Sequence, residues 1–350
     1  MSFADLLNNA KDIAVTESGR MVNKVTNMAA SYLHNTDDWN RIQRLQARRA
    51  MRDNIIKVFD RIYYSLSTHI DPKTARELDI KILTMAPTTD GTPTPSMPYF
   101  KPFSLARLNL YQVDPSHDLT TELRKDMDEM WTAAQCGAHP QAKVLATAIC
   151  QAFAHYERIK PHESYPLNSE DQDYTLEDGY NFQESYTLEE VSGWKRMWQS
   201  KRIVDAKYLQ PSPSSSDNTN GNHNSLATKS SYSLSGAWMR DDSRSHLKLI
   251  MHQDIPPCED LLAAEVMAIL AMVRSRLSGV TLQEHNIIPV TVISSMNEFA
   301  ARILQAYYSE DELIVFKSGL YHFNDKHKRD DYINLFMLYL ASEPVGDTTG

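Results

Sequence analysis

The sequence contains little cysteine and little glycine. Its three cysteines, Cys136, Cys150 and Cys258, form no C-x-x-C pair. They are too few and too scattered for a disulfide framework or a thiolate zinc site, so we expect reduced thiols. The eleven glycines form no G-x-G-x-x-G or G-x-x-x-x-G-K-[ST] pattern, and H-E-x-x-H and G-x-S-x-G are also absent. These absences argue against the familiar nucleotide-binding enzymes and serine hydrolases.

Long hydrophobic runs are also missing, and we expect no secretory leader. The best apolar run, residues 261–273, is interrupted by Glu265 and falls short of the roughly 18 residues that span a bilayer. The first twenty residues lack the basic and apolar regions of a secretory signal. We therefore expect a soluble, intracellular protein, cytoplasmic or nuclear, with no membrane contact, no cofactor and no bound metal.

Hydrophobic residues make up 42% of the 350 residues and charged residues 23%, which is typical of a globular protein with room for two domains. Helix-type spacing of apolar residues runs from Thr36 to about residue 68, and two more helices are predicted at residues 118–135 and from Pro140 onward. Residues 78–85 and 105–113 remain open as short strands. We predict a mostly helical domain over residues 1–160, with a coiled or helical N-terminal region.

Residues 161–190 contain no Lys or Arg and nine acids, which equals the whole net charge of −9. Thr187 and Glu190 form a T-x-x-E capping box that predicts a helix start. Residues 211–235 are rich in Ser and Asn and almost without apolar residues, which predicts disorder. Residues 161–236 are thus interpreted as a partly disordered connector; for the acidic run 161–190, a docking strip for a basic partner is the alternative.

Residues 237–350 have a different pattern. A helix is predicted at residues 259–277, followed by three strands at 287–294, 301–308 and 313–317 and a helix at 332–341. The last two strands are joined by a short polar connection that favours a hairpin. The predicted class is α+β, with a small α+β C-terminal domain ordered helix, three strands, helix.

The same region resembles a known group of sequences. The residues that carry the resemblance are the run from Pro289 to Met296, the run from Ala301 to Tyr307 and the end from Pro344 to Thr348. They resemble a group of uncharacterised filamentous-fungal proteins that share a P-V-x-x-x-S-x-M and A-R-x-L-Q-A block. The resemblance covers about the last third of the chain and implies no activity or site residues.

Two sets of charged residues are candidate sites. The order helix, strand, hairpin, helix is similar to the core of PD-(D/E)XK nucleases, which hold a divalent metal with an acid and an E-x-K motif. No acid precedes Lys317 by two residues, which leaves a degenerate set: Glu265, Asp311, Glu312 and Lys317. The second set is a basic helix face suited to nucleic-acid phosphates: Arg41, Arg44, Arg48, Arg49 and Arg52.

No catalytic constellation stands out among these features. The leading hypothesis is therefore an intracellular protein that acts by protein–protein contacts with an unidentified protein partner. The alternatives are a divergent nuclease-like domain in residues 237–350 and nucleic-acid binding through the Arg41–Arg52 helix face, which remains open but is not favoured.

Overall fold

The computed structural model describes residues 36–65, 67–93, 97–159, 185–197, 232–240, 243–279, 282–309 and 311–349. The chain divides into two compact units, Met1–Ala50 and Met51–Gly350. Within the first unit, residues 36–50 form the beginning of helix α3 (Thr36–Tyr64). The second unit contains the rest of α3 and every other described element.

One mixed sheet organises the second unit. In the described part of the chain its strand order is β2-β13-β12-β11-β9-β8-β7, and β14 also pairs with β12. The sheet strands are β2 (Ile80–Thr84), β7 (Lys195–Arg196), β8 (Tyr232–Met239), β9 (Leu247–Gln253), β11 (Val290–Met296), β12 (Ala300–Ser309), β13 (Glu312–Lys317) and β14 (Tyr321–His322). Neighbouring strands are parallel in two pairs, β9 with β11 and β2 with β13, and antiparallel in the other pairs.

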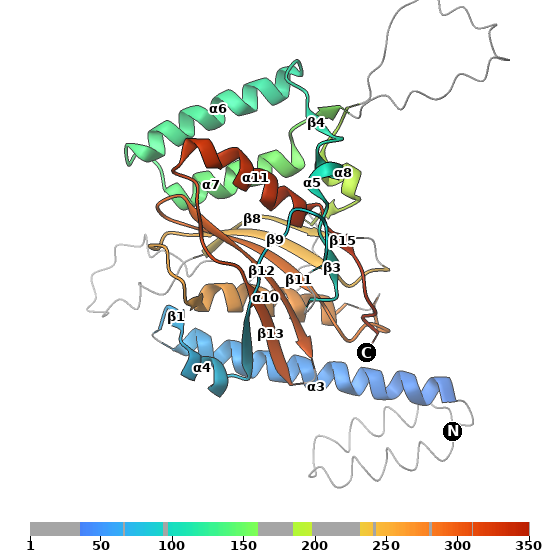
Figure 1. Ribbon diagram of the computed structural model, residues 1–350. Helices are drawn as coiled ribbons and strands as arrows, with labels where there is room; N and C mark the ends of the chain where they lie inside the picture. Colours follow the sequence, from blue (N-terminus) through green and yellow to red (C-terminus); the bar gives the residue numbers. More distant parts are fainter. Residues whose placement is uncertain are drawn as a thin grey trace, which may run out of the picture. The chain divides into compact units, whose positions relative to one another are not determined.

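Helices cover both faces of this sheet (Figure 1). The core on one face is formed with α10 (Ala263–Leu277), α4 (Pro72–Glu77) and the part of α3 after Ala50. The core on the other face is formed with five helices. They are α5 (Leu105–Leu108), α6 (Asp118–Gln135), α7 (Gln141–Ala154), α8 (Leu188–Ser192) and α11 (Lys326–Leu340).

Burial on both faces explains why the central strands are nearly continuous apolar runs. In β11, Val290 and Val292 belong to the α10 side and Ile293 belongs to the α7 and α11 side. Because side chains alternate along a strand, adjacent apolar residues fill two separate cores. Polar residues within these strands are therefore buried as well, and most buried polar groups in proteins have a hydrogen-bond partner.

Short strand pairs tie the connections to this frame. They are β1 (His69–Ile70) with β10 (Leu261–Leu262), β3 (Phe100–Lys101) with β15 (Glu343–Pro344), and β4 (Gln112–Val113) with β5 (Arg158–Ile159) and β6 (Ser185–Tyr186). The first pair brings the chain before α4 next to the start of α10. This contact builds the site described below.

The structure contains helices and mixed sheets, so the α+β class is confirmed. The helices predicted at residues 118–135 and from Pro140 are α6 and α7, and the three C-terminal strands and their hairpin are β11, β12 and β13. The segment 78–85 contains the strand β2. The segment 105–113 instead contains α5 and the two-residue strand β4.

The expected boundaries at residues 160 and 237 do not coincide with the division of the structure. Strand β2 comes from residues 1–160, yet it pairs with β13 from residues 237–350. Helices α7 and α11 also share one core across these boundaries. The physical reason is that the strands after α10 have two apolar faces, and elements from the first half of the chain cover them.

Part of the expected connector is folded. Thr187 and Glu190 form the predicted capping box, and the helix that it starts, α8, ends at Gly193 with φ 67°. Residues 232–235 of the Ser/Asn-rich region belong to β8. Residues 160–184 and 198–231, which hold most of the acidic and Ser/Asn-rich sequence, lie outside the described residues.

Among the helices of the described residues, none has the length and apolar character needed to cross a bilayer.

Candidate functional site

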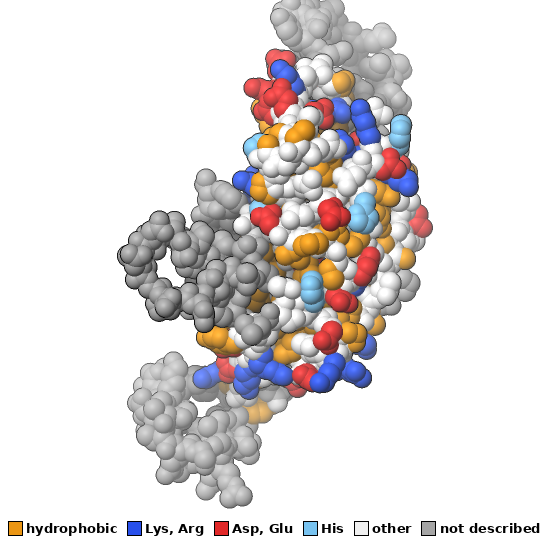
Figure 2. All heavy atoms as spheres, turned by 90° about the vertical axis from the view of Figure 1, so that its left-hand side faces the viewer, with side chains coloured by type: hydrophobic (Ala, Val, Ile, Leu, Met, Phe, Trp, Pro, Cys, Tyr) orange, Lys and Arg blue, Asp and Glu red, His pale blue; other side chains and the backbone are white. Residues whose placement is uncertain are grey.

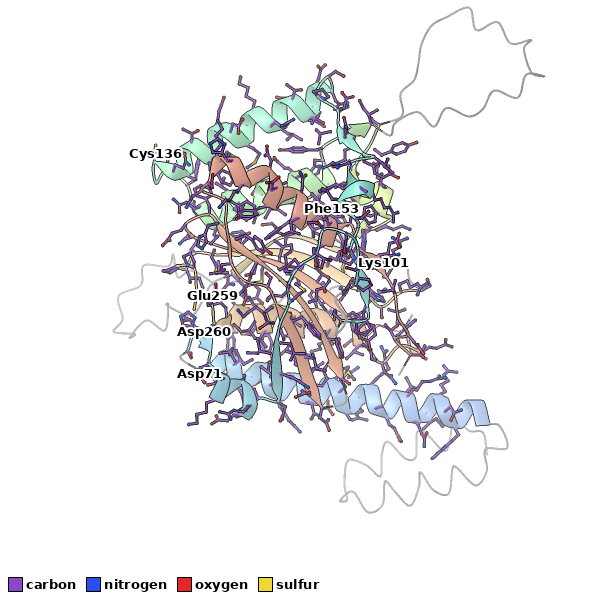
Figure 3. The ribbon with its side chains drawn as sticks, in the orientation of Figure 1. Asp71, Lys101, Cys136, Phe153, Glu259 and Asp260 are labelled. Atoms are coloured by element: carbon purple, nitrogen blue, oxygen red, sulfur yellow. The ribbon has the colours of Figure 1, made fainter. Side chains whose placement is uncertain are left out.

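A cavity of about 610 Å³ lies along strand β2. We name it the β2 groove; its walls come from α4, from the chain that leads into β10, and from β13. Its lining is Ile70, Pro72, Ala75, Arg76, Asp79, Ile80, Lys81, Ile82, Glu259, Asp260, Leu261, Glu312 and Lys317. Figure 3 shows Glu259 and Asp260 on the same side of the molecule as Asp71, the residue before α4. The groove thus combines an apolar floor with charges of both signs.

Local sequence chemistry places α4 beside β2. The carboxylate of Asp71 caps the helix by accepting hydrogen bonds from the backbone N–H groups of Lys73 and Thr74, both at 2.8 Å. Pro72 occupies the first turn, where its missing N–H is no loss. Asp79 then adopts a left-handed conformation with φ 53° and turns the chain into β2. The short helix is therefore held against the strand that follows it.

Strand β2 is the end strand of the sheet and pairs only with β13 among the described residues. Leu313 donates its N–H to the carbonyl of Asp79, and Met85 donates to the carbonyl of Lys317. Because hydrogen-bonding direction alternates along a strand, the backbone groups of Ile80, Ile82 and Thr84 point away from β13. The groove is lined by side chains from both faces of β2, since Lys81 lies on the opposite face from Ile80 and Ile82. The groove therefore follows the free edge of the strand.

A fully buried ion pair lies beneath one end of the groove. Arg302 on β12 and Glu265 on α10 both have no exposed side-chain surface. The guanidinium donates from Nε to Oε1 at 2.8 Å and from Nη2 to Oε2 at 2.6 Å, which is a bidentate geometry. Glu265 Oε2 also accepts the backbone N–H of Leu262 at 2.9 Å. Both charges are satisfied inside the protein, as burial requires.

The same guanidinium fixes the chain that leads into β10. Arg302 Nη1 donates to the carbonyls of Cys258 and Glu259, and Nη2 donates to that of Asp260. These bonds hold the backbone of residues 258–260 while the side chains of Glu259 and Asp260 reach the surface. Glu259 Oε2 then lies 3.4 Å from Lys317 Nζ. The buried pair thus positions the acidic rim of the groove.

The four residues of the nuclease-like set do not form one cluster. Glu265 is committed to Arg302, and Asp311 accepts a hydrogen bond from the side chain of Asn54 at 2.8 Å. Glu312 and Lys317 both line the groove, but they stand five residues apart and therefore on opposite faces of β13. Within the described residues, no group of three His, Cys, Asp or Glu side chains is suited to hold a metal ion.

The basic helix face differs from its sequence-based prediction. Arg48 is buried with 4% of its surface exposed, whereas Arg41 and Arg49 are exposed and Arg44 and Arg52 are intermediate. One stripe along the helix contains positions 48, 51, 52, 55, 59 and 62, and its apolar members are core residues. Arg48 therefore lies on the buried stripe and not on a solvent-facing basic surface. The helix predicted from the sequence is present, and of the five arginines Arg48 alone is buried.

A second buried polar centre, around Lys248, was not predicted from the sequence. Lys248 on β9 has no exposed surface, and its ammonium donates to the carbonyls of Leu340 and Ser342 at the end of α11. It lies 3.8 Å from the ring centroid of Trp194, whose Nε1 donates to the same Ser342 carbonyl at 3.0 Å. Burial lowers the pKa of Lys248 well below its usual value. An isolated Lys in the apolar run LKLIM was the available signal.

His246 lies two residues before Lys248, directly ahead of β9, and is also buried. Its Nε2 donates to the carbonyl of Val345 at 3.1 Å, and the rings of Tyr99 and Phe100 contact it edge-on. Burial lowers the pKa of His246 to about 4, although its hydrogen bonds to backbone carbonyls act in the opposite direction. The neutral imidazole and Lys248 together hold the chain after α11 against β9.

One serine–histidine contact lies elsewhere on the sheet. Ser235 sits in an irregularity of the β8–β9 pairing, and its Oγ is 3.1 Å from His252 Nδ1. Nucleophilic catalysis requires a third group that orients the base. Burial lowers the pKa of His252, the charge of Asp254 opposes this shift only in part, and no described carboxylate hydrogen-bonds the ring. We interpret the contact as a cross-strand hydrogen bond that fixes the irregularity.

The cysteines lack the features of reactive thiols. Cys150 is buried, and burial raises its pKa to about 11 despite the nearby charge of Arg196. Cys136 is exposed after α6, and Cys258 lies in the chain held by Arg302. A thiolate is needed for nucleophilic attack, so the raised pKa keeps Cys150 inert. The expectation of reduced thiols is consistent with three free cysteines in the structure.

Figure 2 shows the side of the molecule that is on the left in Figure 1. Hydrophobic surface lies between scattered acidic side chains there, and Lys and Arg gather along the lower edge. Such a surface suits a polypeptide with alternating chemistry better than a uniformly charged polymer. Comparison of the chain with protein-family models, with curated proteins and with solved structures found no match in any of the three.

Proposed function

We propose that this protein acts by binding another polypeptide in the β2 groove. The observation that supports the proposal is the position of the groove: a cavity of about 610 Å³ follows the free edge of an end strand. Its floor is apolar at Ile80, Ile82 and Leu261, and its rim carries charges of both signs. Peptide-binding surfaces commonly combine an apolar floor with a polar rim in this way.

The chemistry of the lining favours binding over turnover. The buried carboxylate nearest the groove, Glu265, is fully engaged by Arg302 and by the N–H of Leu262. A general acid or base needs a free site within hydrogen-bond reach of a substrate. Glu259 and Lys317 on the rim neutralise each other as an ion pair. These contacts fix the shape of the groove and leave its charges at the surface.

A displayed library of random peptides, selected on the full-length protein, tests this proposal. The variant Glu259→Arg places a cation next to Lys317 at an exposed position, where the fold tolerates it. Glu284→Arg is the matched control, because Glu284 is exposed and does not line the groove. We expect peptides that bind the wild-type protein and the control but bind Glu259→Arg at least several-fold more weakly.

Two results would contradict the proposal. One is that no peptide is enriched above background on the wild-type protein. The other is that enriched peptides bind all three proteins equally, which would place their contact outside the groove. Circular dichroism of the three proteins establishes that Glu259→Arg keeps the fold before its binding is compared.

A further inference from the structure

The backbone of β2 offers an incomplete ladder beside the groove. The N–H and carbonyl groups of Ile80, Ile82 and Thr84 point away from β13, and no described strand pairs with them. Unpaired groups of an end strand are a template for one more strand. An added strand would lie in the cavity, since the cavity follows this edge. The groove thus has the geometry of strand addition as well as room for side chains.

The side chains of β2 determine which strand fits. Ile80 and Ile82 lie on the α10 side, where the groove floor is apolar, and Lys81 lies on the opposite face. Lys81 is exposed and forms no ion pair with a described acidic residue. Residues opposite each other on neighbouring strands interact directly, and opposite charges there are favourable. A complementary strand therefore alternates apolar, acidic, apolar.

The same lysine argues against a second copy of this chain as the occupant. Two β2 strands paired antiparallel about Ile82 would bring both Lys81 side chains to one face, on diagonal positions. Like charges at that separation repel, and a lysine in an end strand is a common protection against self-pairing. The charge that disfavours self-pairing is the one that attracts an acidic side chain.

We propose that the occupant of the β2 groove is an extended segment of a different protein, which adds as a strand to β2 and places an acidic side chain opposite Lys81. This inference rests on the proposed function and specifies its binding mode. The apolar side chains of the added strand, which flank the acidic one, pack against Ile80, Ile82 and Leu261. The backbone hydrogen bonds form whatever the sequence of the added strand is, and the alternation of its apolar and acidic side chains supplies specificity.

The test uses the full-length protein and three blocked synthetic peptides. One alternates valine with glutamate, one alternates valine with lysine, and one carries proline in place of the central valines of the first. We expect the glutamate peptide to slow amide exchange at Ile80, Ile82 and Thr84 and not at Lys81 or Leu83, whose N–H groups already face β13. The proline peptide, which lacks donors, leaves exchange unchanged.

Lys81→Glu and the control Lys125→Glu complete the experiment; Lys125 is exposed on α6, on the other side of the sheet. We expect Lys81→Glu to lower the affinity for the glutamate peptide by about five- to tenfold and to raise the affinity for the lysine peptide. The control Lys125→Glu should bind both peptides as the wild type does. Equal binding of both peptides, protection at residues other than 80, 82 and 84, or dimerisation through β2 overturns this inference. If library peptides still need Glu259 in that case, the proposed function stands and only its strand-addition mode fails.

Discussion

Buried ionisable residues hold the parts of this protein together at the residue scale. Arg302 and Glu265 satisfy each other, and Arg302 has further bonds to three carbonyls. Lys248 has no carboxylate partner among the described residues and bonds carbonyls instead. A buried charge without partners costs several kcal/mol, so each of these side chains depends on a specific neighbouring backbone. His246 avoids the cost by remaining neutral.

His246 therefore links stability to pH. The folded-state pKa of His246 is about 4 and its ordinary value is 6.5. The folded protein binds this proton less readily than the unfolded chain does. The stabilisation that neutral His246 contributes is therefore fully present above pH 6.5 and is lost as the pH falls toward 4. The shift corresponds to roughly 3 kcal/mol in the free energy of unfolding. Urea unfolding of the wild type and of His246→Gln measures it.

We expect the difference in free energy of unfolding between the wild type and His246→Gln to change across this pH window. The glutamine keeps an amide donor for the Val345 carbonyl and does not titrate. Carboxylates that titrate in the same window are common to both proteins and cancel in the difference. A difference that is constant from above pH 6.5 to pH 4 would show that His246 is not the linked group.

The elements of the fold are joined by the chain that follows α11. Lys248 donates to the carbonyls of Leu340 and Ser342, Trp194 also donates to that of Ser342, and His246 donates to that of Val345. The last carbonyls of a helix have no partner within the helix, and a cation there is favourable. Strand β9 thus supplies the C-terminal cap of α11 from its own interior.

The variant Lys248→Met tests this capping. Methionine keeps much of the apolar stem but removes both hydrogen bonds to the Leu340 and Ser342 carbonyls. We expect amide exchange to accelerate at the end of α11 and in residues 341–345, with a loss of roughly 1–3 kcal/mol in the free energy of unfolding. Lys326→Met, at an exposed position at the start of α11, should leave both unchanged. Equal protection in Lys248→Met and the wild type would mean that the lysine does not cap the helix.

Element prediction from the sequence succeeded where periodicity was strong. The pattern of α6 and the apolar alternation of β12 and β13 are local properties, and their bounds agree closely with the structure. Strand β9 was not predicted, because Lys248 and His252 interrupt its apolar run. Lys248 is buried there with its ammonium on the carbonyls of Leu340 and Ser342, which come from a distant part of the chain. No local pattern encodes that partnership.

For the molecule as a whole, one sheet unites residues far apart in the chain. Strand β2 completes the sheet at β13, and α7 covers β9 and β11 from the opposite side to α10. We expect residues 237–350, expressed alone, to show no cooperative thermal unfolding, because their sheet loses β2 and because the apolar surface that α5, α6, α7 and α8 cover is exposed. The full-length protein should unfold cooperatively in the same calorimetric measurement.

A single sharp transition in the 237–350 fragment, with the enthalpy expected for its size, would restore the division into two domains.

The net charge helps to explain why that division was attractive. The acidic residues between 161 and 190 carry the whole net charge, and a run of like charge resembles a linker. In the structure, residues 185–197 fold against β8, and Trp238 donates to Glu189 Oε2 at 2.9 Å.

The amino-acid sequence by itself determined the α+β class, the positions of the strongly periodic helices and strands, the capping box at Thr187 and the three unpaired cysteines. Each of these depends on residues close together in the chain, whose physics is local. Only the tertiary structure decided that Glu265 pairs with Arg302, that Arg48 is buried, and that β2 ends the sheet beside a groove. Those outcomes depend on which distant elements cover each face, because burial and hydrogen-bond partners are set by packing and not by sequence spacing.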